Sequence, residues 1–369
     1  MTNKINNNAK WVVRVFIALA LTTILIIAQT ACGSQQVDKV SKSEECLDTT
    51  CEISVYNMNK SEANKALTKA FDKINDLENL MSRTIKGSDV YKINHASGKY
   101  VEVSDETLEV IKLAINMSEA SGGKFDITLG KISEMWNFNG DNPKVPEDSD
   151  IKSALACVGY NNIQIDGNQV RLKNAGAHMD LGGIAKGYIA DQVTDVLEDN
   201  DVDSAIINLG GNVVAIGKKS DNKKFIIGVE RPYTDRTEIV GAVEAENQTL
   251  VTSGIYERYF EEDGVKYHHV LDPATGYPVK TDLEAVTIVA DKGNSGFCDA
   301  MSTTCLILGE KDAKAFVAKM QKKYPKKHIE ASFINSDDDV STTDGMNLNL
   351  TDSSNSSSSS NSSSSNSSK

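Results

Sequence analysis

The chain has no excess of basic residues, no internal repeat and no second apolar stretch of membrane-spanning length after its N-terminal run. Lys and Arg number 39 against 52 Asp and Glu, which gives a net charge of −13 at pH 7. This charge argues against binding to nucleic acid and against charge-driven binding to anionic lipid. An acidic protein that binds a diphosphate also needs local help from backbone amides, a lysine or a metal ion.

The cysteines follow no zinc-binding pattern. There are six, at irregular spacings, in contrast to the paired ligands of structural zinc sites. Outside the cytoplasm, Cys46 and Cys51 are close enough in sequence to form a small-loop disulfide, an alternative that the sequence leaves open. We expect Cys157, Cys298 and Cys305 to be buried free thiols.

The N-terminus reads as a targeting segment. Lys10 and Arg14 precede an apolar run over 15–28, followed by Gln29-Thr-Ala-Cys-Gly33. Small residues before a cysteine resemble a bacterial lipobox, which predicts a signal peptide over 1–31, lipidation of Cys32 and a linker over 32–43. The alternative is an uncleaved signal anchor. In both cases we expect the body outside the cytoplasm, and a lipid would hold it at the membrane surface without spanning it.

The C-terminal segment over 336–369 turns to Ser, Asn and Asp, a composition that buries too little apolar surface to fold, so we predict a disordered tail. The remaining body, 44–335, is long enough for one large domain or two intimate ones. Its alternating patterns predict a mixed α/β or α+β core. We expect helices over 66–81, 104–121, 184–197 and 299–308, and strands over 51–56, 163–165, 170–172, 205–209, 225–229, 239–243 and 286–290.

Two separate segments point to chemistry. The first is His178-Met-Asp-Leu-Gly-Gly-Ile-Ala-Lys-Gly-Tyr188, which supplies an acid, a glycine pair and a lysine within one turn. The second is Asp299-Ala-Met-Ser-Thr303, in which a carboxylate and a hydroxyl four residues apart share one helix face. Glycine allows close approach of a backbone to a ligand, and such oxygen donors suit a hard cation. Together they predict a metal-assisted site for a diphosphate.

These segments belong to a longer series of blocks whose order and spacing resemble the ApbE-like FAD:protein FMN transferase family. The blocks are Met81-Ser82 with Ile93-Asn94, Phe125-Asp-Ile-Thr-Leu-Gly130 with Trp136, Asp180 to Tyr188 with Asp191, Asn208-Leu-Gly-Gly-Asn212, Thr252-Ser-Gly254 with Tyr256-Glu-Arg258, His268 to Pro278, and Asp299 to Thr303. The resemblance covers nearly the whole body. It implies mixed sheets flanked by helices, with FAD in a central cleft.

The resemblance also implies an activity. FMN would pass from FAD to a threonine or serine hydroxyl of another protein through a phosphoester bond, with release of AMP and help from Mg²⁺. Acceptors would be FMN-carrying subunits or domains of membrane or extracytoplasmic redox proteins, which act in trans because this chain shows no acceptor domain of its own. Two alternatives remain: an FAD-binding carrier lipoprotein without turnover, and a Mg²⁺-dependent FAD pyrophosphatase.

Site residues carried over from the family fall into three groups. The metal ligands would be Gly183 through its backbone oxygen, Asp299 and Thr303, with Ser302 standing where some relatives have an acid. His269 would take or orient the proton of the attacking hydroxyl. The flavin-binding residues would be Met81, Phe125, Asp126, Asp180, Lys186 and Leu271.

Plainer explanations exist for several of these residues. Met81 and Phe125 also fit an apolar core, Asp126 fits a turn cap, and Asp299 fits a charge at a helix N-terminus. The glycines of 208–211 and 252–254 fit either a pocket wall or ordinary tight turns. His268 differs from relatives, and we expect it to have no part in the chemistry.

Overall fold

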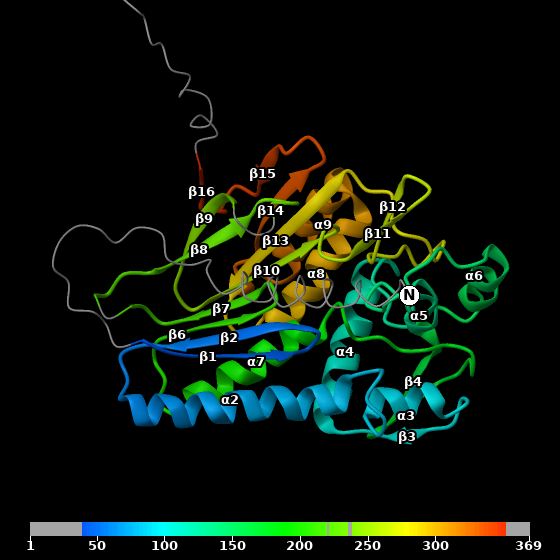
Figure 1. The fold of residues 1–369 in the computed structure, drawn as a ribbon, viewed down its shortest axis with the longest axis horizontal. Coiled ribbons are helices and arrows are strands. Elements are labelled where there is room, and N and C mark those ends of the chain that lie inside the picture. Colours follow the sequence, from blue (N-terminus) through cyan, green and yellow to red (C-terminus); the bar gives the residue numbers. More distant parts are fainter. Residues whose placement is uncertain (1–38, 220, 235–237, 352–369) are drawn as a thin grey trace, which may run out of the picture.

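The computed structural model describes residues 39–219, 221–234 and 238–351. Its centre is an eight-stranded antiparallel sheet in the order β1-β2-β6-β7-β10-β13-β14-β15 (Figure 1). These strands are β1 (Val40–Cys46), β2 (Thr49–Val55), β6 (Ala205–Leu209), β7 (Asn212–Ile216), β10 (Gln248–Gly254), β13 (Leu283–Asp291), β14 (Glu330–Asn335) and β15 (Val340–Thr342).

Three small antiparallel sheets complete the strand inventory of the described residues. One has the order β16-β9-β8, with β16 (Leu348–Leu350), β9 (Ile239–Ala245) and β8 (Phe225–Glu230). Another has the order β3-β5-β4, with β3 (Val101–Glu102), β5 (Gln169–Leu172) and β4 (Ile163–Asp166). The third is the hairpin of β11 (Tyr259–Glu262) and β12 (Val265–His268).

Helices pack against one face of the large sheet and form the main core with it. In Figure 1, α2 and α7 run beneath the β1-β2-β6-β7 end of this sheet. The α-helices are α2 (Lys60–Met81), α3 (Asp89–His95), α4 (Asp105–Ala120), α5 (Gly130–Trp136), α6 (Asp148–Leu155), α7 (Ala185–Glu198), α8 (Ser295–Leu308) and α9 (Glu310–Lys323). Two short 3₁₀ turns cover Tyr160–Asn162 and Pro325–Lys327.

Helix patterning follows the expected spacing of apolar residues. The helix α2 buries one stripe that consists of Ala63, Ala66, Leu67, Ala70, Phe71, Ile74, Leu77 and Met81. The helix α4 begins where Ser104 accepts a hydrogen bond from the Thr107 backbone N–H at 3.1 Å, a cap predicted from the sequence. It ends at Ala120, and Gly122 and Gly123, which follow the Ser121 cap, both adopt positive φ.

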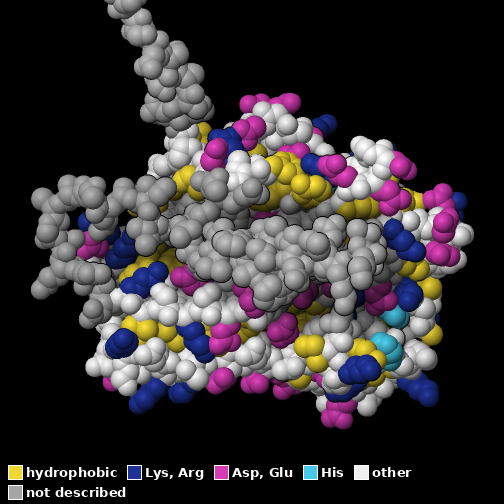
Figure 2. All heavy atoms as spheres, in the orientation of Figure 1, with side chains coloured by type: hydrophobic (Ala, Val, Ile, Leu, Met, Phe, Trp, Pro, Cys, Tyr) yellow, Lys and Arg dark blue, Asp and Glu magenta, His cyan; other side chains and the backbone are white. Residues whose placement is uncertain are grey.

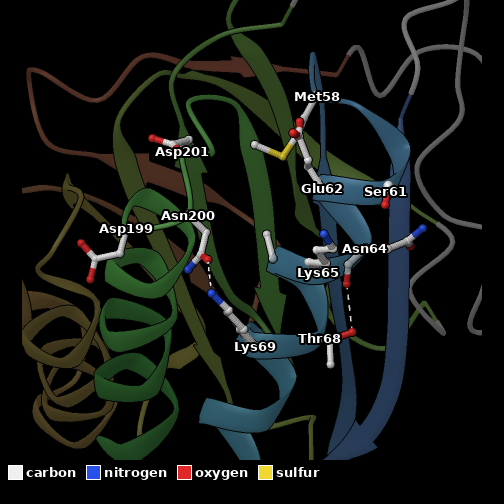
Figure 3. Close-up of a pocket in the computed structure, with 11 residues that line it drawn as sticks. Met58, Ser61, Glu62, Asn64, Lys65, Thr68, Lys69, Asp199, Asn200 and Asp201 are labelled. Carbon is white, nitrogen blue, oxygen red and sulfur yellow. Dashed lines mark hydrogen bonds between the residues drawn. The ribbon is translucent and has the colours of Figure 1, made fainter.

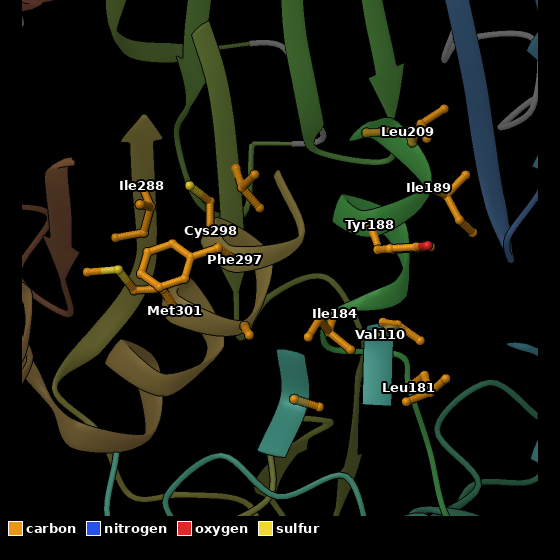
Figure 4. Packing of buried hydrophobic residues seen from close by; sticks show 14 of the residues in the cluster. Val110, Leu181, Ile184, Tyr188, Ile189, Leu209, Ile288, Phe297, Cys298 and Met301 are labelled. Carbon is orange, nitrogen blue, oxygen red and sulfur yellow. The ribbon is translucent and has the colours of Figure 1, made fainter. Parts of the chain in front are cut away.

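The helices α7 and α8 interlock, and this contact positions the site. The carboxylate of Asp191 on α7 accepts hydrogen bonds from the backbone N–H groups of Ser295 and Gly296 at 2.8 and 2.9 Å, so it caps the start of α8. A Cβ on Gly187 would lie 2.2 Å from the carbonyl oxygen of Ser295. Only glycine therefore allows this approach. Figure 4 shows the apolar packing around the pair, with Ile184 just before α7, Tyr188 from α7 and Met301 from α8.

The opposite face of the large sheet is covered by the β16-β9-β8 sheet, which forms a second core with it. A third cluster surrounds Trp136, whose indole N–H donates to the carbonyl of Gly276 at 2.9 Å. This bond ties α5 to the loop that follows β12. The expected strands and helices are all present, and the predicted α+β architecture is confirmed.

Two predicted boundaries differ from the structure. The strand β1 begins at Val40, inside the predicted linker, and β15 and β16 lie inside the predicted disordered tail. Both segments are ordered because they pair with neighbouring strands: β1 pairs with β2, and β15 pairs with β14. Residues 1–31, Cys32 and the segment 352–369 lie outside the described residues.

The described cysteines are all free thiols, so Cys46 and Cys51 do not form a disulfide in this structure. Cys298 and Cys305 are buried as expected, whereas Cys157 is only partly buried, because it follows α6 near the surface. No helix among the described residues is both long and apolar enough to cross a bilayer. On the face shown in Figure 2, basic side chains are scattered among acidic ones.

Candidate active site

The turn before α7 brings the acid and the glycine pair of the first motif together. Asp180 enters this turn with its backbone N–H bonded to the carbonyl of Ile127 at 2.8 Å. Its side-chain Oδ1 accepts the N–H of Gly182 at 2.9 Å. Its other oxygen, Oδ2, pairs with Arg83 Nε at 3.1 Å. The carboxylate therefore holds the turn and is itself held by a cation.

Gly183 lies against two other predicted site residues. A Cβ built on it would meet Phe125 Cε2 at 3.3 Å and Thr303 Oγ1 at 3.5 Å. Phe125 is buried, whereas Thr303 is partly exposed. The hydroxyl of Thr303 makes no hydrogen bond to another residue in the described ranges. The structure thus brings together three residues that lie far apart in the sequence.

Asp299 lies in the second turn of α8, and its side chain is only 3 % exposed. Its Oδ2 accepts the backbone N–H of Gly187 at 2.9 Å. The side-chain amide of Asn212 also acts on this carboxylate and lowers its pKa. Burial raises the pKa of Asp299, and the positive charge of Lys186 and these two groups oppose the rise. The carboxylate is thus oriented toward α7. Its contacts with α7 go beyond the favourable interaction of an acid with a helix N-terminus.

The available donors fit a hard cation. Asp299 offers a carboxylate, Thr303 one helical turn further on offers a hydroxyl, and Gly183 against Thr303 offers a backbone oxygen. All three donor types suit Mg²⁺. An orphaned acceptor supports this fit, because Oδ1 of Asn212 is buried without a hydrogen-bond partner next to Asp299. The part of the chain that the structure describes has no cluster of three His, Cys, Asp or Glu side chains suited to a metal. Mg²⁺ instead accepts few protein ligands and takes the rest from substrate phosphates and water.

His269 follows directly after β12, at the base of the β11-β12 hairpin. Its backbone N–H donates to the carbonyl of Arg258 at 3.0 Å, and its ring Nδ1 lies 3.2 Å from the same oxygen. A carbonyl only accepts, so Nδ1 carries the proton and Nε2 is left as the basic nitrogen. Burial, followed by the charge of Arg258, lowers the pKa of His269 to about 3. The imidazole is therefore neutral near pH 7, with Nε2 unprotonated, and the low pKa makes it a weaker base than a free histidine.

Lys186 belongs to the same electrostatic environment. It lies in the first turn of α7, and its Nζ donates to the carbonyl of Gly182 at 3.4 Å. Its charge acts on the pKa of both Asp299 and His269, which places the cation near each of them. A lysine at a helix N-terminus is favoured only with an anion nearby, which suits a phosphate.

Ser302, which precedes Thr303 in the second motif, is used for packing. Ser302 is fully buried, and its hydroxyl bonds to the hydroxyl of Ser253 at 2.7 Å and to the carbonyl of Asp299 at 2.9 Å. His268 is buried as well, with Nε2 3.1 Å from the carbonyl of Val279. Both side chains hold the loops around the site together.

The remaining predicted flavin residues have contacts within the protein. Asp126 accepts the N–H and hydroxyl of Thr128 at 2.8 and 2.6 Å and the N–H of Tyr160 at 2.7 Å, so it braces two loops. Met81 is buried in the main core and Leu271 in the Trp136 cluster. These contacts agree with the plainer explanations, and they leave a role at the edge of a flavin pocket open to test.

Two hollows of the surface differ in their relation to these residues. A hollow of about 280 Å³ is lined by Gly123, Asp126, Tyr160 and Asp272, next to predicted flavin residues. A larger one of about 740 Å³ lies between the start of α2 and the end of α7, where Lys69 donates to Asn200 (Figure 3). It is about 20 Å from the N-terminal end of α7, judging by the length of that helix, so it is no part of the site.

Sequence reasoning assigned no role to three residues that the structure places here. Arg83 pairs with Asp180, Gly187 supplies the N–H that binds Asp299, and Asn212 adds its amide. Asn212 and Gly187 lie inside sequence blocks shared with the family, but these blocks alone do not indicate which residues the two contact. Arg83 lies in a polar loop whose contacts depend on the fold.

These features define an α+β protein with oxygen donors, a lysine and a histidine gathered around one turn. The chain belongs to the ApbE family, whose sequence signature matches residues 47–326. A FAD:protein FMN transferase of Treponema pallidum is 30 % identical over 350 residues, which are 90 % of this chain and 94 % of the relative. One from Klebsiella pneumoniae is 33 % identical over 287 residues, or 77 % and 86 % of the two chains.

Solved structures agree with this membership. The ApbE protein of Thermotoga maritima superimposes with a TM-score of 0.75 at 32 % identity, over 84 % of this chain and 97 % of that one. The flavin transferase ApbE of Vibrio cholerae gives a TM-score of 0.73 at 26 % identity, again over 84 % and 97 % of the two chains.

Proposed function

We propose that this chain is an FAD:protein FMN transferase that moves FMN from FAD to a threonine or serine hydroxyl of an acceptor protein. The observation that supports this most is the meeting of Gly183, Asp299 and Thr303 beside Lys186 and a neutral His269. Oxygen donors for a cation, a positive charge for a phosphate and a proton acceptor are the components that phosphoryl transfer needs.

The bond changes balance with these residues. The acceptor oxygen forms a bond to the phosphorus of the FMN half, the P–O bond to AMP breaks, and the hydroxyl proton passes to Nε2 of His269. Lys186 neutralises charge on the diphosphate as AMP leaves. A bound Mg²⁺ would polarise the diphosphate, held by Asp299, Thr303 and the Gly183 carbonyl.

The proposed setting is the outer face of a cell membrane. The support is the sequence before the described residues, where an apolar run precedes Cys32 in a lipobox-like context. A lipid on Cys32 would hold the enzyme near FMN-carrying subunits or domains of membrane and extracytoplasmic redox proteins. Alkaline release of the lipid followed by mass spectrometry tests this placement.

The direct test of the activity is the intact mass of an acceptor domain after incubation with the detergent-solubilised full chain, FAD and Mg²⁺. We expect a gain of one FMN, which is lost with EDTA and in Asp299→Ala. Asp195→Ala is the matched control, because it removes an exposed carboxylate of α7. FAD consumed to FMN and AMP without a mass gain would favour a pyrophosphatase. FAD bound and unchanged would favour a carrier, provided that a known transferase modifies the same acceptor.

A further inference from the structure

Asn212 begins β7 near the Asp299 carboxylate, and the residue is only 1 % exposed. Its amide acts on Asp299 and lowers the pKa of that carboxyl. Its other polar atom, Oδ1, has no hydrogen-bond partner. Within residues 39–219, 221–234 and 238–351, the only other buried side-chain atom in this situation is Oγ of Ser332.

The orientation of this amide follows from chemistry. A carboxylate only accepts hydrogen bonds, so the NH₂ group must face Asp299 and Oδ1 must face another way. The backbone of Asn212 is fixed as well, because it pairs with Leu209 on one side and Val251 on the other. The side chain therefore has little freedom to turn toward an alternative donor.

A buried acceptor without a donor is unfavourable, and native proteins rarely keep one without a reason. Here the orphaned oxygen lies next to the carboxylate that, with Thr303 and Gly183, offers oxygen donors to a cation. A cation, or a water molecule bound to it, would supply the missing partner.

We propose that Asn212 is a positioning residue for the cation site: its NH₂ group fixes the Asp299 carboxylate, and its Oδ1 binds the cation or one of the waters on it. The inference rests on the proposed Mg²⁺ site. Groups that orient metal ligands typically change metal affinity about 10- to 100-fold when they are removed. A merely structural Asn212 would instead affect folding and leave metal affinity unchanged.

The test uses Mn²⁺ as the probe, with the detergent-solubilised full chain and no FAD. Free Mn²⁺ is counted by its electron paramagnetic resonance signal, which gives the dissociation constant without any turnover. The main variant is Asn212→Leu, which has similar volume and no polar atom. Asn212→Ser is the second variant, for the case that leucine prevents folding. Ser332→Ala is the matched control, because it removes the other orphaned buried atom, on β14.

We expect Asn212→Leu to weaken Mn²⁺ binding by about 10-fold or more, Asn212→Ser to weaken it in the same direction, and Ser332→Ala to leave it unchanged. Wild-type affinity in a variant that still melts cooperatively would overturn the proposal, as would an equal loss in Ser332→Ala. The readout is separate from transfer. If wild-type protein modifies no acceptor but Asn212→Leu still loses Mn²⁺, the proposed function fails and the role of Asn212 stands.

Discussion

Replacement of Gly187 by alanine tests the contact on which the site depends. The added Cβ would lie 2.2 Å from the carbonyl oxygen of Ser295 and 2.8 Å from Cβ of Asp299, whereas real Cβ contacts stay above 3.0 Å. The helices α7 and α8 must therefore separate by at least 0.8 Å at this point, the difference between 3.0 and 2.2 Å. The first of these atoms belongs to the backbone and the second is bonded to it, so the clash cannot be relieved by rotation of a flexible side chain.

The magnitude follows from three terms. Overpacking costs about 1–3 kcal/mol, and a hydrogen bond to a charged group, here from Gly187 to Asp299, contributes about 1.5–3 kcal/mol. Alanine returns about 1 kcal/mol of helix propensity. The free energy of unfolding should fall by about 1.5–5 kcal/mol, which lowers Tm by roughly 2–8 °C in a domain of about 300 residues, at about 2.1 cal/mol/K per residue.

Circular dichroism at 222 nm measures Tm, and Mn²⁺ titration measures whether Asp299 is still held. Gln192→Ala, a substitution at a half-buried position of the same helix, should change the free energy of unfolding by less than about 0.5 kcal/mol. A Gly187→Ala protein with unchanged Tm and unchanged Mn²⁺ affinity would refute the packing argument.

Three further predictions concern proton transfer, pH and thiol access. His269→Ala should lower kcat for transfer by about 10²- to 10⁴-fold, since the base is lost, while Mn²⁺ affinity stays unchanged. Burial lowers the pKa of His268 to about 4, whereas the histidine of the unfolded chain has a pKa of about 6.5. Between these two values the unfolded chain binds more protons, so the free energy of unfolding should fall as pH drops from about 6.5 to 4. His268→Gln should reduce the accompanying fall in Tm. Cys157, the partly exposed thiol among those described, should react with iodoacetamide before the buried four, as read by peptide mass.

Each of these has a clear contrary result. Full turnover in His269→Ala would remove the proposed base. A pH profile of Tm that is identical in His268→Gln and wild-type protein would mean that His268 is not the titrating group. Early labelling of Cys298, which is fully buried in α8, would show that α8 opens more readily than its packing suggests.

Much of the fold could be predicted from local pattern. The buried stripe of α2, the Ser104 cap of α4 and the strands over 205–209 and 286–290 all depend on residues close in sequence. The helix α9, which has 14 residues and buries Ala313, Phe316, Val317 and Met320 at helical spacing, was not predicted. The other elements that were not predicted include ones that are short or depend on distant partners. The helix α3 has seven residues, and β15 and β16 are strands of three residues whose pairing with β14 and β9 defines them.

The site was predictable in its residues but not in their contacts. Helical spacing places Asp299 and Thr303 on one face, and the structure agrees. The approach of Gly187 to Ser295 and the orphaned oxygen of Asn212 arise from packing between α7, α8 and β7, which no local pattern encodes. The pKa of His269 likewise depends on burial and on Arg258, not on neighbours in sequence alone.

The manner in which His269 is held has a consequence for how the enzyme can diversify. Its backbone N–H and its ring Nδ1 both hydrogen-bond to the main-chain carbonyl oxygen of residue 258, an atom that any amino acid would supply at that position. The hairpin from Tyr259 to His268 can therefore change its exposed side chains, and even the residues of its tip, without moving the histidine. An enzyme built this way can change the surface beside His269, the proposed proton acceptor, to suit different protein substrates while the histidine stays in place.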